Sequence, residues 1–185
     1  MIIGVTGRRG SGKDTVADYL KDRHGFSALD FTRDVLSSEL KKRGLAVTRD
    51  NLISLAMEGR RKAHNGIWAE KLSDVVKAKG KGDFVISGVR FMEEVETFKK
   101  HLGEDFILIS VICDDKARHE RCRKRGTKGE ANLTFEEFMA KDERPTEKAI
   151  LKTMRDSDYA VDNNGTISDL YSQIDKIIKA LKENR

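Results

Sequence analysis

A glycine-rich segment directly after an apolar run constrains this chain of 185 residues more than any other feature. It reads Gly7-Arg8-Arg9-Gly10-Ser11-Gly12-Lys13 and follows residues 1–6, which we expect to form a buried strand. The glycines let backbone N–H groups turn toward an anion, the positive end of the following helix points at it, and Lys13 reaches its outer phosphates. The segment therefore predicts a polyphosphate-binding loop.

One position departs from the pattern of such loops. The pattern has Ser or Thr directly after the lysine, whereas this chain has Asp14, with Thr15 one place later. A glycine-rich turn that binds nothing is the alternative interpretation. It would require the lysine, the spaced glycines and the strand-to-helix context to coincide by chance.

Length and charge limit the other possibilities. The length fits a single domain, residues 1–185, with one core. Charged residues make up 36% of the chain and the formal net charge is +5, but lysines and arginines are interleaved with acids along the whole sequence. This favours a mixed-charge surface over a nucleic-acid-binding face, and it suits a small anionic ligand.

Two features bear on the compartment. Cys113 and Cys122 have no C-x-x-C spacing, so we expect free thiols in a reducing environment. The apolar run 1–6 is short and leads straight into the glycine loop, which is typical of a core strand and not of a secretory signal, and no segment has the length to span a bilayer. We expect a cytoplasmic protein that does not enter a membrane.

Short apolar runs alternating with helical patterns predict an α/β fold with a parallel sheet between helix layers. Thr134 and Glu137 form a capping box, and Pro145 is expected to end or bend the helix that they open. The polar stretch 126–132 is expected to be a mobile loop. Strands are expected at 1–6, 26–31, 84–87, 106–113 and 159–161, and helices at 15–23, 34–43, 48–62, 66–79, 92–101, 116–125, 134–144 and 166–183.

Several cationic side chains stand where they could assist phosphoryl transfer, which requires positive charge around the transferred group. Arg118, Arg121 and Arg125 share one face of a predicted helix just before the polar loop, either as lid residues or as a solvated face paired with nearby acids. Arg90 follows the third strand, where ligands bind in parallel sheets, and it could grip a phosphate or pair with a neighbouring glutamate.

Three polar residues lie at the end of the second strand. Asp30, Arg33 and Asp34 are candidates to contact the second substrate or to help organise Mg²⁺. Asp34 is equally well explained as an acid in the first turn of a helix.

Together these residues resemble the adenylate-kinase-like P-loop kinases, which include nucleoside monophosphate kinases and dephospho-CoA kinases. Within that group the chain is most similar to archaeal predicted nucleotide kinases related to dephospho-CoA kinase, over nearly its whole length. The motifs that carry the resemblance are Gly7-x-x-Gly10-Ser11-Gly12-Lys13-Asp14-Thr15, Thr48-Arg49-Asp50-Asn51-Leu52, Gly88-Val89-Arg90 with Glu94-Val95-Glu96, the helix from Arg118 to Arg125, and Asp162-Asn163-Asn164-Gly165.

The resemblance implies a three-layer P-loop NTPase fold with five parallel strands in the order 2-3-1-4-5. It also implies a helical acceptor-binding insertion at about 30–79 and a lid at about 118–144. Arg90 would hold the acceptor phosphate, Arg121 and Arg125 would close from the lid, and Asn163 and Gly165 would line the adenine pocket. The residues that would hold ATP and its Mg²⁺ are Gly7, Gly10, Ser11, Gly12, Lys13, Asp14 and Thr15, with the metal assigned to Thr15 and Asp14.

Ser87 is a second departure, because many relatives have an aspartate directly before the Gly-x-Arg motif. One hypothesis links it to Asp14, with the acid moved from the strand end to the loop. The expected activity is ATP-dependent phosphoryl transfer to a small phosphorylated acceptor, foremost a nucleoside monophosphate. A dephospho-CoA kinase-like enzyme, with Asp30 or Asp34 as base, and a nucleotide-binding switch that acts through a protein or RNA partner are the alternatives.

Overall fold

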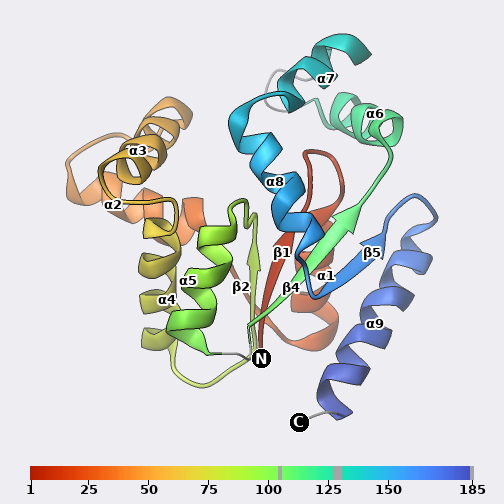
Figure 1. Ribbon diagram of the computed structural model, residues 1–185, viewed down its shortest axis with the longest axis horizontal. Coiled ribbons are helices and arrows are strands. Elements are labelled where there is room, and N and C mark those ends of the chain that lie inside the picture. The colour runs from red at the N-terminus through yellow and green to blue at the C-terminus, as the bar shows by residue number, and fades with distance from the viewer. Residues whose placement is uncertain (104–105, 127–130, 184–185) are drawn as a thin grey trace.

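The computed structural model describes residues 1–103, 106–126 and 131–183 (Figure 1). Within these ranges five strands form one parallel sheet in the order β2-β3-β1-β4-β5. The predicted fold class and strand order are therefore confirmed. The strands are β1 (Ile2–Thr6), β2 (Ser27–Asp30), β3 (Phe84–Ser87), β4 (Phe106–Ile112) and β5 (Tyr159–Asp162).

Helices connect successive strands, as expected for parallel pairing. A π-helical turn, η1 (Thr32–Leu36), precedes the second helix, so helical structure begins earlier there than the predicted residue 34. The α-helices of the described ranges are α1 (Lys13–His24), α2 (Ser37–Lys42), α3 (Arg49–Lys62), α4 (Ile67–Lys79), α5 (Met92–Leu102), α6 (Asp115–Arg125), α7 (Phe135–Asp142), α8 (Pro145–Arg155) and α9 (Ile167–Glu183).

Alternating strand residues feed two cores on opposite faces of the sheet. In β4, Leu108 packs with α4 and α5 on one face, whereas Ile109 packs with α1 and α9 on the other. Trp68 and Phe98 are buried in the first core, and Leu20 and Ile174 are buried in the second. Figure 1 shows these helix pairs on either side of the sheet.

Helix α8 was not predicted. Pro145 was expected to end or bend the preceding helix, and α7 does end before it, at Asp142. Pro145 then occupies the first turn of a new helix, where a missing N–H costs nothing and the ring's fixed φ suits the helix. The mobile loop predicted at 126–132 lies, for residues 127–130, outside the described residues.

The glycine loop lies at the end of the sheet where the parallel strands have their carboxyl ends. Figure 1 shows the loop between β1 and α1 at the end of the sheet where α3, α7 and α8 lie, opposite to the N-terminus. In the part of the chain that the structure describes, no helix has both the length and the apolar character needed to cross a bilayer. Cys113 and Cys122 are free thiols.

Candidate active site

The glycine loop joins β1 to α1 in a form that suits an anion. Gly10 and Gly12 have φ of +80° and +96°, a region that residues with a Cβ rarely adopt. Gly12 is the N-cap residue of α1 and has no side chain to occupy the first N–H groups of the helix. These N–H groups and the positive end of the helix dipole therefore face the space in front of the loop.

Asn163 braces this loop from behind. Its buried side-chain amide donates a hydrogen bond to the Ser11 carbonyl at 2.7 Å. A Cβ on Gly12 would lie 2.2 Å from the same amide nitrogen, so only glycine fits there. The predicted adenine-side residue Asn163 thus contacts the phosphate loop directly. At Gly165, two residues further along, a Cβ would lie 2.8 Å from Asp169 Oδ2.

The three arginines of α6 point in different directions. Arg118 is fully buried, and Arg121 donates hydrogen bonds to the Asn163 carbonyl at 2.8 Å and to Cys113 Sγ at 3.2 Å. Arg125 lines the pocket in front of the loop. The structure therefore brings Arg125 to Lys13 and Arg90, and it places Arg121 at the turn after β5.

Arg118 belongs to an ionic cluster beneath the loop. It donates to the Arg9 carbonyl at 2.9 Å, to Asp142 Oδ2 at 2.6 Å and to Asp115 Oδ1. Arg8 reaches the same Asp142 oxygen at 2.8 Å. Since the Asp142 side chain has no exposed surface, one buried carboxylate of α7 holds both the loop and α6.

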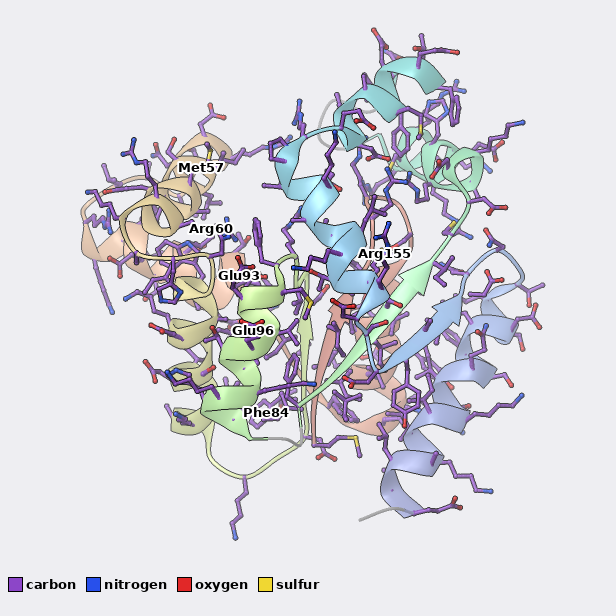
Figure 2. The ribbon with its side chains drawn as sticks, in the orientation of Figure 1. Met57, Arg60, Phe84, Glu93, Glu96 and Arg155 are labelled. Atoms are coloured by element: carbon purple, nitrogen blue, oxygen red, sulfur yellow. The ribbon has the colours of Figure 1, made fainter. Side chains whose placement is uncertain are left out.

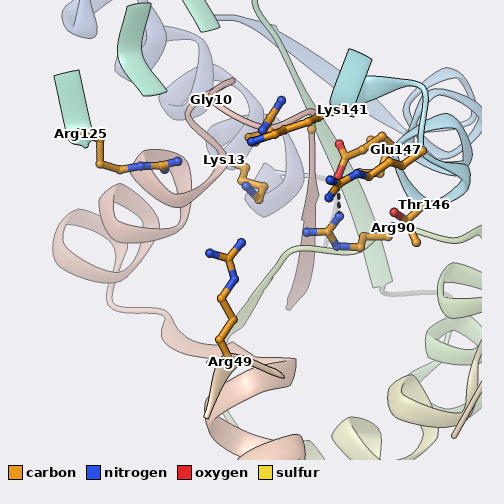
Figure 3. A pocket seen from close by; sticks show the side chains of 12 residues that line it. Gly10, Lys13, Arg49, Arg90, Arg125, Lys141, Thr146 and Glu147 are labelled. Atoms are coloured by element: carbon orange, nitrogen blue, oxygen red, sulfur yellow. Dashed lines mark hydrogen bonds and ion pairs between the residues drawn. The ribbon is translucent and has the colours of Figure 1, made fainter. Parts of the chain in front are cut away.

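A pocket opens in front of the loop. Its volume is about 820 Å³ when the open, solvent-filled space at its mouth is included. Figure 3 shows the side chains of Arg49, Arg90 and Arg125 pointing toward the space around Lys13. Lys141 lies on the side of Lys13 that is opposite to Arg49. Arg49 begins α3, Lys141 lies in α7, and Arg144 caps α8. The cationic lining residues are Arg9, Lys13, Arg49, Arg90, Arg125, Lys141 and Arg144.

Among the described residues that line this pocket, Glu147 is the one carboxylate. Its Oε1 accepts a hydrogen bond from Arg90 at 3.0 Å (dashed in Figure 3). Its Oε2 is buried and has no hydrogen-bond partner among the described residues. Buried carboxylate oxygens are normally hydrogen-bonded, so an acceptor without a partner is unusual at this position.

The turn that carries Arg90 is held from two sides. Buried Glu94 accepts hydrogen bonds from the backbone N–H of Arg90 at 2.8 Å and of Phe91, while the Arg90 carbonyl accepts one from Thr153 of α8. Arg60 of α3, which is labelled in Figure 2, pairs with Glu94 at 3.2 Å. Burial raises the pKa of the Glu94 carboxyl, against the opposing effect of Arg60 and the two N–H groups.

Asp14 and Ser87 are in direct contact. Ser87 Oγ donates a hydrogen bond to Asp14 Oδ1 at 2.8 Å, and Lys13 Nζ lies 3.9 Å from Asp14 Oδ2. The carboxylate is two-thirds exposed at the start of α1, with Thr15 beside it in the chain. Carboxylate and hydroxyl oxygens fit Mg²⁺, which prefers few protein ligands plus phosphate oxygens and waters. The glycine loop, the open helix start and Lys13 fit a triphosphate in the same way.

Asp30, Arg33 and Asp34 pair with one another. Arg33 donates to Asp34 Oδ2 at 2.8 Å and to the Ala28 carbonyl at 2.7 Å, and its backbone N–H donates to Asp30 Oδ1. Asp34 in turn accepts from the Asp30 N–H. None of the three lines the pocket in front of the loop, although Asp30 pairs in register with Ser87 across β2 and β3.

Sequence reasoning did not single out the remaining pocket and support residues. Arg49 lay inside a motif that was noted only for its resemblance, and Glu94 inside another. Asp142 and Arg144 lie within the predicted lid at about 118–144, but α8 was not predicted, so neither residue was assigned a role at the loop or the pocket. The residues missed are Arg49, Asp142, Lys141, Arg144 and Glu147 at the pocket and loop, and Arg60 and Glu94 at the Arg90 turn.

Comparisons with known proteins give matches over most of the chain. The profile of a family described as AAA domain matches residues 3–142. A UPF0200/UPF0201 protein of Archaeoglobus fulgidus is 31% identical over 99% of the chain, which spans 56% of that protein's length. A UPF0200 protein of Pyrococcus horikoshii is 30% identical over the whole chain and 99% of its own length.

Solved structures share the fold. A gluconokinase from Sinorhizobium meliloti superimposes with a TM-score of 0.60 at 15% identity, covering 98% of this chain and 93% of its own. A shikimate kinase from Acinetobacter baumannii, in complex with shikimate, gives a TM-score of 0.57 at 12% identity, covering 100% and 94%. The fold is therefore that of P-loop kinases.

Proposed function

The chain belongs to the AAA domain family and to the UPF0200 proteins, and from that premise we propose that it is an ATP- and Mg²⁺-dependent phosphotransferase acting on a small phosphorylated acceptor. The observation that carries the proposal is the pocket in front of the glycine loop, where loop-side and acceptor-side cations meet. A nucleoside monophosphate is the foremost acceptor. We place the enzyme in the adenylate-kinase-like group and in the cytoplasm.

The ATP side is assigned to the loop. Amides from Gly7 to Gly12 and the Lys13 ammonium stabilise the β- and γ-phosphate oxygens, because electrostatic stabilisation and positioning dominate phosphoryl transfer. Asp14 and Thr15 hold Mg²⁺, which neutralises charge that develops between the phosphates. Asn163 and Gly165 support the adenine side, and Arg121 fixes their turn.

The acceptor side is assigned to the opposite wall. Arg90 and Arg49 approach from two different elements, so an acceptor phosphate between them is gripped from both sides. Arg125, Lys141 and Arg144 come from the predicted lid and its end, and they compensate the charge of the transferred group while they exclude water. Asp30, Arg33 and Asp34 contact the acceptor only after their mutual pairs open.

The position of Glu147 supports a second class of acceptor, one that reacts through a hydroxyl group. A phosphate acceptor is already a nucleophile, whereas a hydroxyl acceptor, as in a dephospho-CoA kinase-like reaction, needs a group that takes its proton. Glu147 is a better candidate for this role than Asp30 or Asp34, since it lines the pocket in front of the loop and they do not. A switch that only hydrolyses ATP is less well supported, because the cations of the acceptor wall would then have no ligand.

An ADP-release screen tests the proposal. Nucleoside monophosphates, dephospho-CoA and phosphomevalonate are each added to the protein with ATP and Mg²⁺, and we expect one class to stimulate ADP formation. Lys13→Ala should abolish the stimulation, while Lys21→Ala, at an exposed position of the same helix, should keep it. Acceptor-independent ADP formation with every compound would favour the switch.

A further inference from the structure

The two residues that depart from the expected patterns, one in the phosphate loop and one at the end of β3, touch each other. Asp14 stands where such loops carry a hydroxyl residue after the lysine, and Ser87 ends β3. Ser87 Oγ donates to Asp14 Oδ1 at 2.8 Å, although the residues are 73 positions apart in the chain. Two unusual positions that meet in space point to one shared role.

The backbone fixes this contact. Ser87 pairs in register with Val5 of β1, and the Gly88 N–H donates to the Val5 carbonyl at 3.0 Å. The end of β3 is therefore held directly beside the strand that leads into the glycine loop. Asp14 lies in the first turn of α1, at the other end of that loop.

In P-loop NTPases Mg²⁺ is held by the loop Ser or Thr hydroxyl, by a strand-end aspartate and by the phosphates. The same two ligand types are present here, but each occupies the other's position. We infer that the loop and the strand end have exchanged their metal-side groups, so that Asp14 supplies the carboxylate and Ser87 the hydroxyl. This inference rests on the proposed binding of ATP with Mg²⁺.

Charge explains why the two positions have to change together. Two hydroxyls would leave the metal side without an anionic protein group, and two carboxylates in contact would repel each other and the phosphates. One carboxylate and one hydroxyl keep the charge of the ordinary arrangement. The hydrogen bond from the Ser87 hydroxyl also fixes the orientation of the Asp14 carboxylate.

A simpler explanation is that Asp14 only complements the positive end of α1, as acids in a first helical turn do. The two accounts differ in their dependence on the metal. If Asp14 only stabilises the helix, its removal leaves the effect of Mg²⁺ on nucleotide binding unchanged. If it is on the metal side, its removal reduces that effect, and an aspartate at position 87 restores it.

Calorimetric titration with the non-hydrolysable analogue AMPPNP, in Mg²⁺ and in EDTA, separates these outcomes. The exchange predicts that Asp14→Ser lowers the gain in affinity given by Mg²⁺ by about tenfold or more. The double variant Asp14→Ser with Ser87→Asp should recover most of it. Asp18→Ser, one turn further along α1 and exposed, should behave as wild type. Mn²⁺ bound with AMPPNP, followed by electron paramagnetic resonance, should show the same order of variants.

A failure of the proposed function and a failure of the exchange between Asp14 and Ser87 give different results. A wild-type protein that binds AMPPNP in neither condition would contradict the proposed function and the exchange with it. Binding with a Mg²⁺ gain that Asp14→Ser leaves intact would overturn the exchange alone. A double variant no better than Asp14→Ser would do the same, provided that its melting temperature matches that of the single variant.

Discussion

The guanidinium of Arg118 donates a hydrogen bond to the carboxylate of Asp142 at 2.6 Å, and both side chains are buried. Through this contact and the bond from Arg118 to the Arg9 carbonyl, α7 is tied to the glycine loop. The position of the loop thus depends on a helix that begins more than a hundred residues later.

The first prediction concerns Asp142. Asp142→Asn leaves Arg8 and Arg118 without their buried counter-charge, and breaking a buried pair in this way typically costs about 3 kcal/mol or more of unfolding free energy. Urea unfolding measures this loss of unfolding free energy. Glu143→Gln, at the exposed neighbouring position, is the matched control and should unfold as wild type does. Equal stability of the two variants would show that the cluster contributes nothing.

The second prediction concerns the brace behind the loop. Asn163→Ala removes the donor to the Ser11 carbonyl and should cost about 1–2 kcal/mol of stability, together with a loss of ATP affinity. Gly12→Ala should have the larger effect on affinity, because its Cβ would collide with Asn163 at a φ of +96°. Gly25→Ala has open space at a similar φ and controls for backbone strain alone. Titration with AMPPNP measures the nucleotide affinity of each variant. Equal affinity for Gly12→Ala and Gly25→Ala would contradict the predicted collision with Asn163.

The third prediction is a pH dependence set by Glu94. Burial raises the pKa of its carboxyl above the unfolded value of about 4.3. The folded state therefore keeps a proton that the unfolded chain has lost, and this contribution to stability is full below that value and disappears as pH rises through the folded pKa. The unfolding free energy of wild type, minus that of Glu94→Gln, should fall as the pH rises above about 4.3. Glu96→Gln, exposed on the same helix, is the control, and a difference that rises with pH would refute the assignment.

The fourth prediction separates the two candidate acceptors. If the acceptor is a hydroxyl compound, Glu147→Gln should lower kcat by about a hundredfold or more, because a proton acceptor is lost, while the KM for ATP is unchanged. If it is a nucleoside monophosphate, kcat should change far less. Arg90→Ala should raise the acceptor KM in both cases. Steady-state kinetics at fixed ATP decides, and an unchanged acceptor KM in Arg90→Ala would remove Arg90 from the acceptor wall.

Much of this fold was predictable because its signals are local. The glycine loop, the apolar run 106–113 and the capping box at Thr134 each lie within a few neighbouring residues, and the structure contains the loop, a strand over Phe106–Ile112 and the capping box. The strand order came from the resemblance, since single-sequence periodicity does not determine which strands are neighbours.

The parts that were missed depend on contacts between distant residues. Pro145 was interpreted as a helix breaker, although the same residue is favoured at the start of a helix, and only the packing of α8 decides between the two. Helical spacing placed Arg118, Arg121 and Arg125 on one face. It could not show that Arg118 is buried against Asp142, or that Arg121 donates a hydrogen bond to the Asn163 carbonyl.

In the proposed reaction the γ-phosphoryl group of ATP moves to a second small molecule. Incubation with γ-³²P-labelled ATP, Mg²⁺ and the acceptor panel, followed by chromatographic separation, measures this transfer directly. We expect label on one acceptor class, with little free phosphate and no transfer by Lys13→Ala. Label found only as inorganic phosphate, at a rate that no acceptor changes, would contradict it.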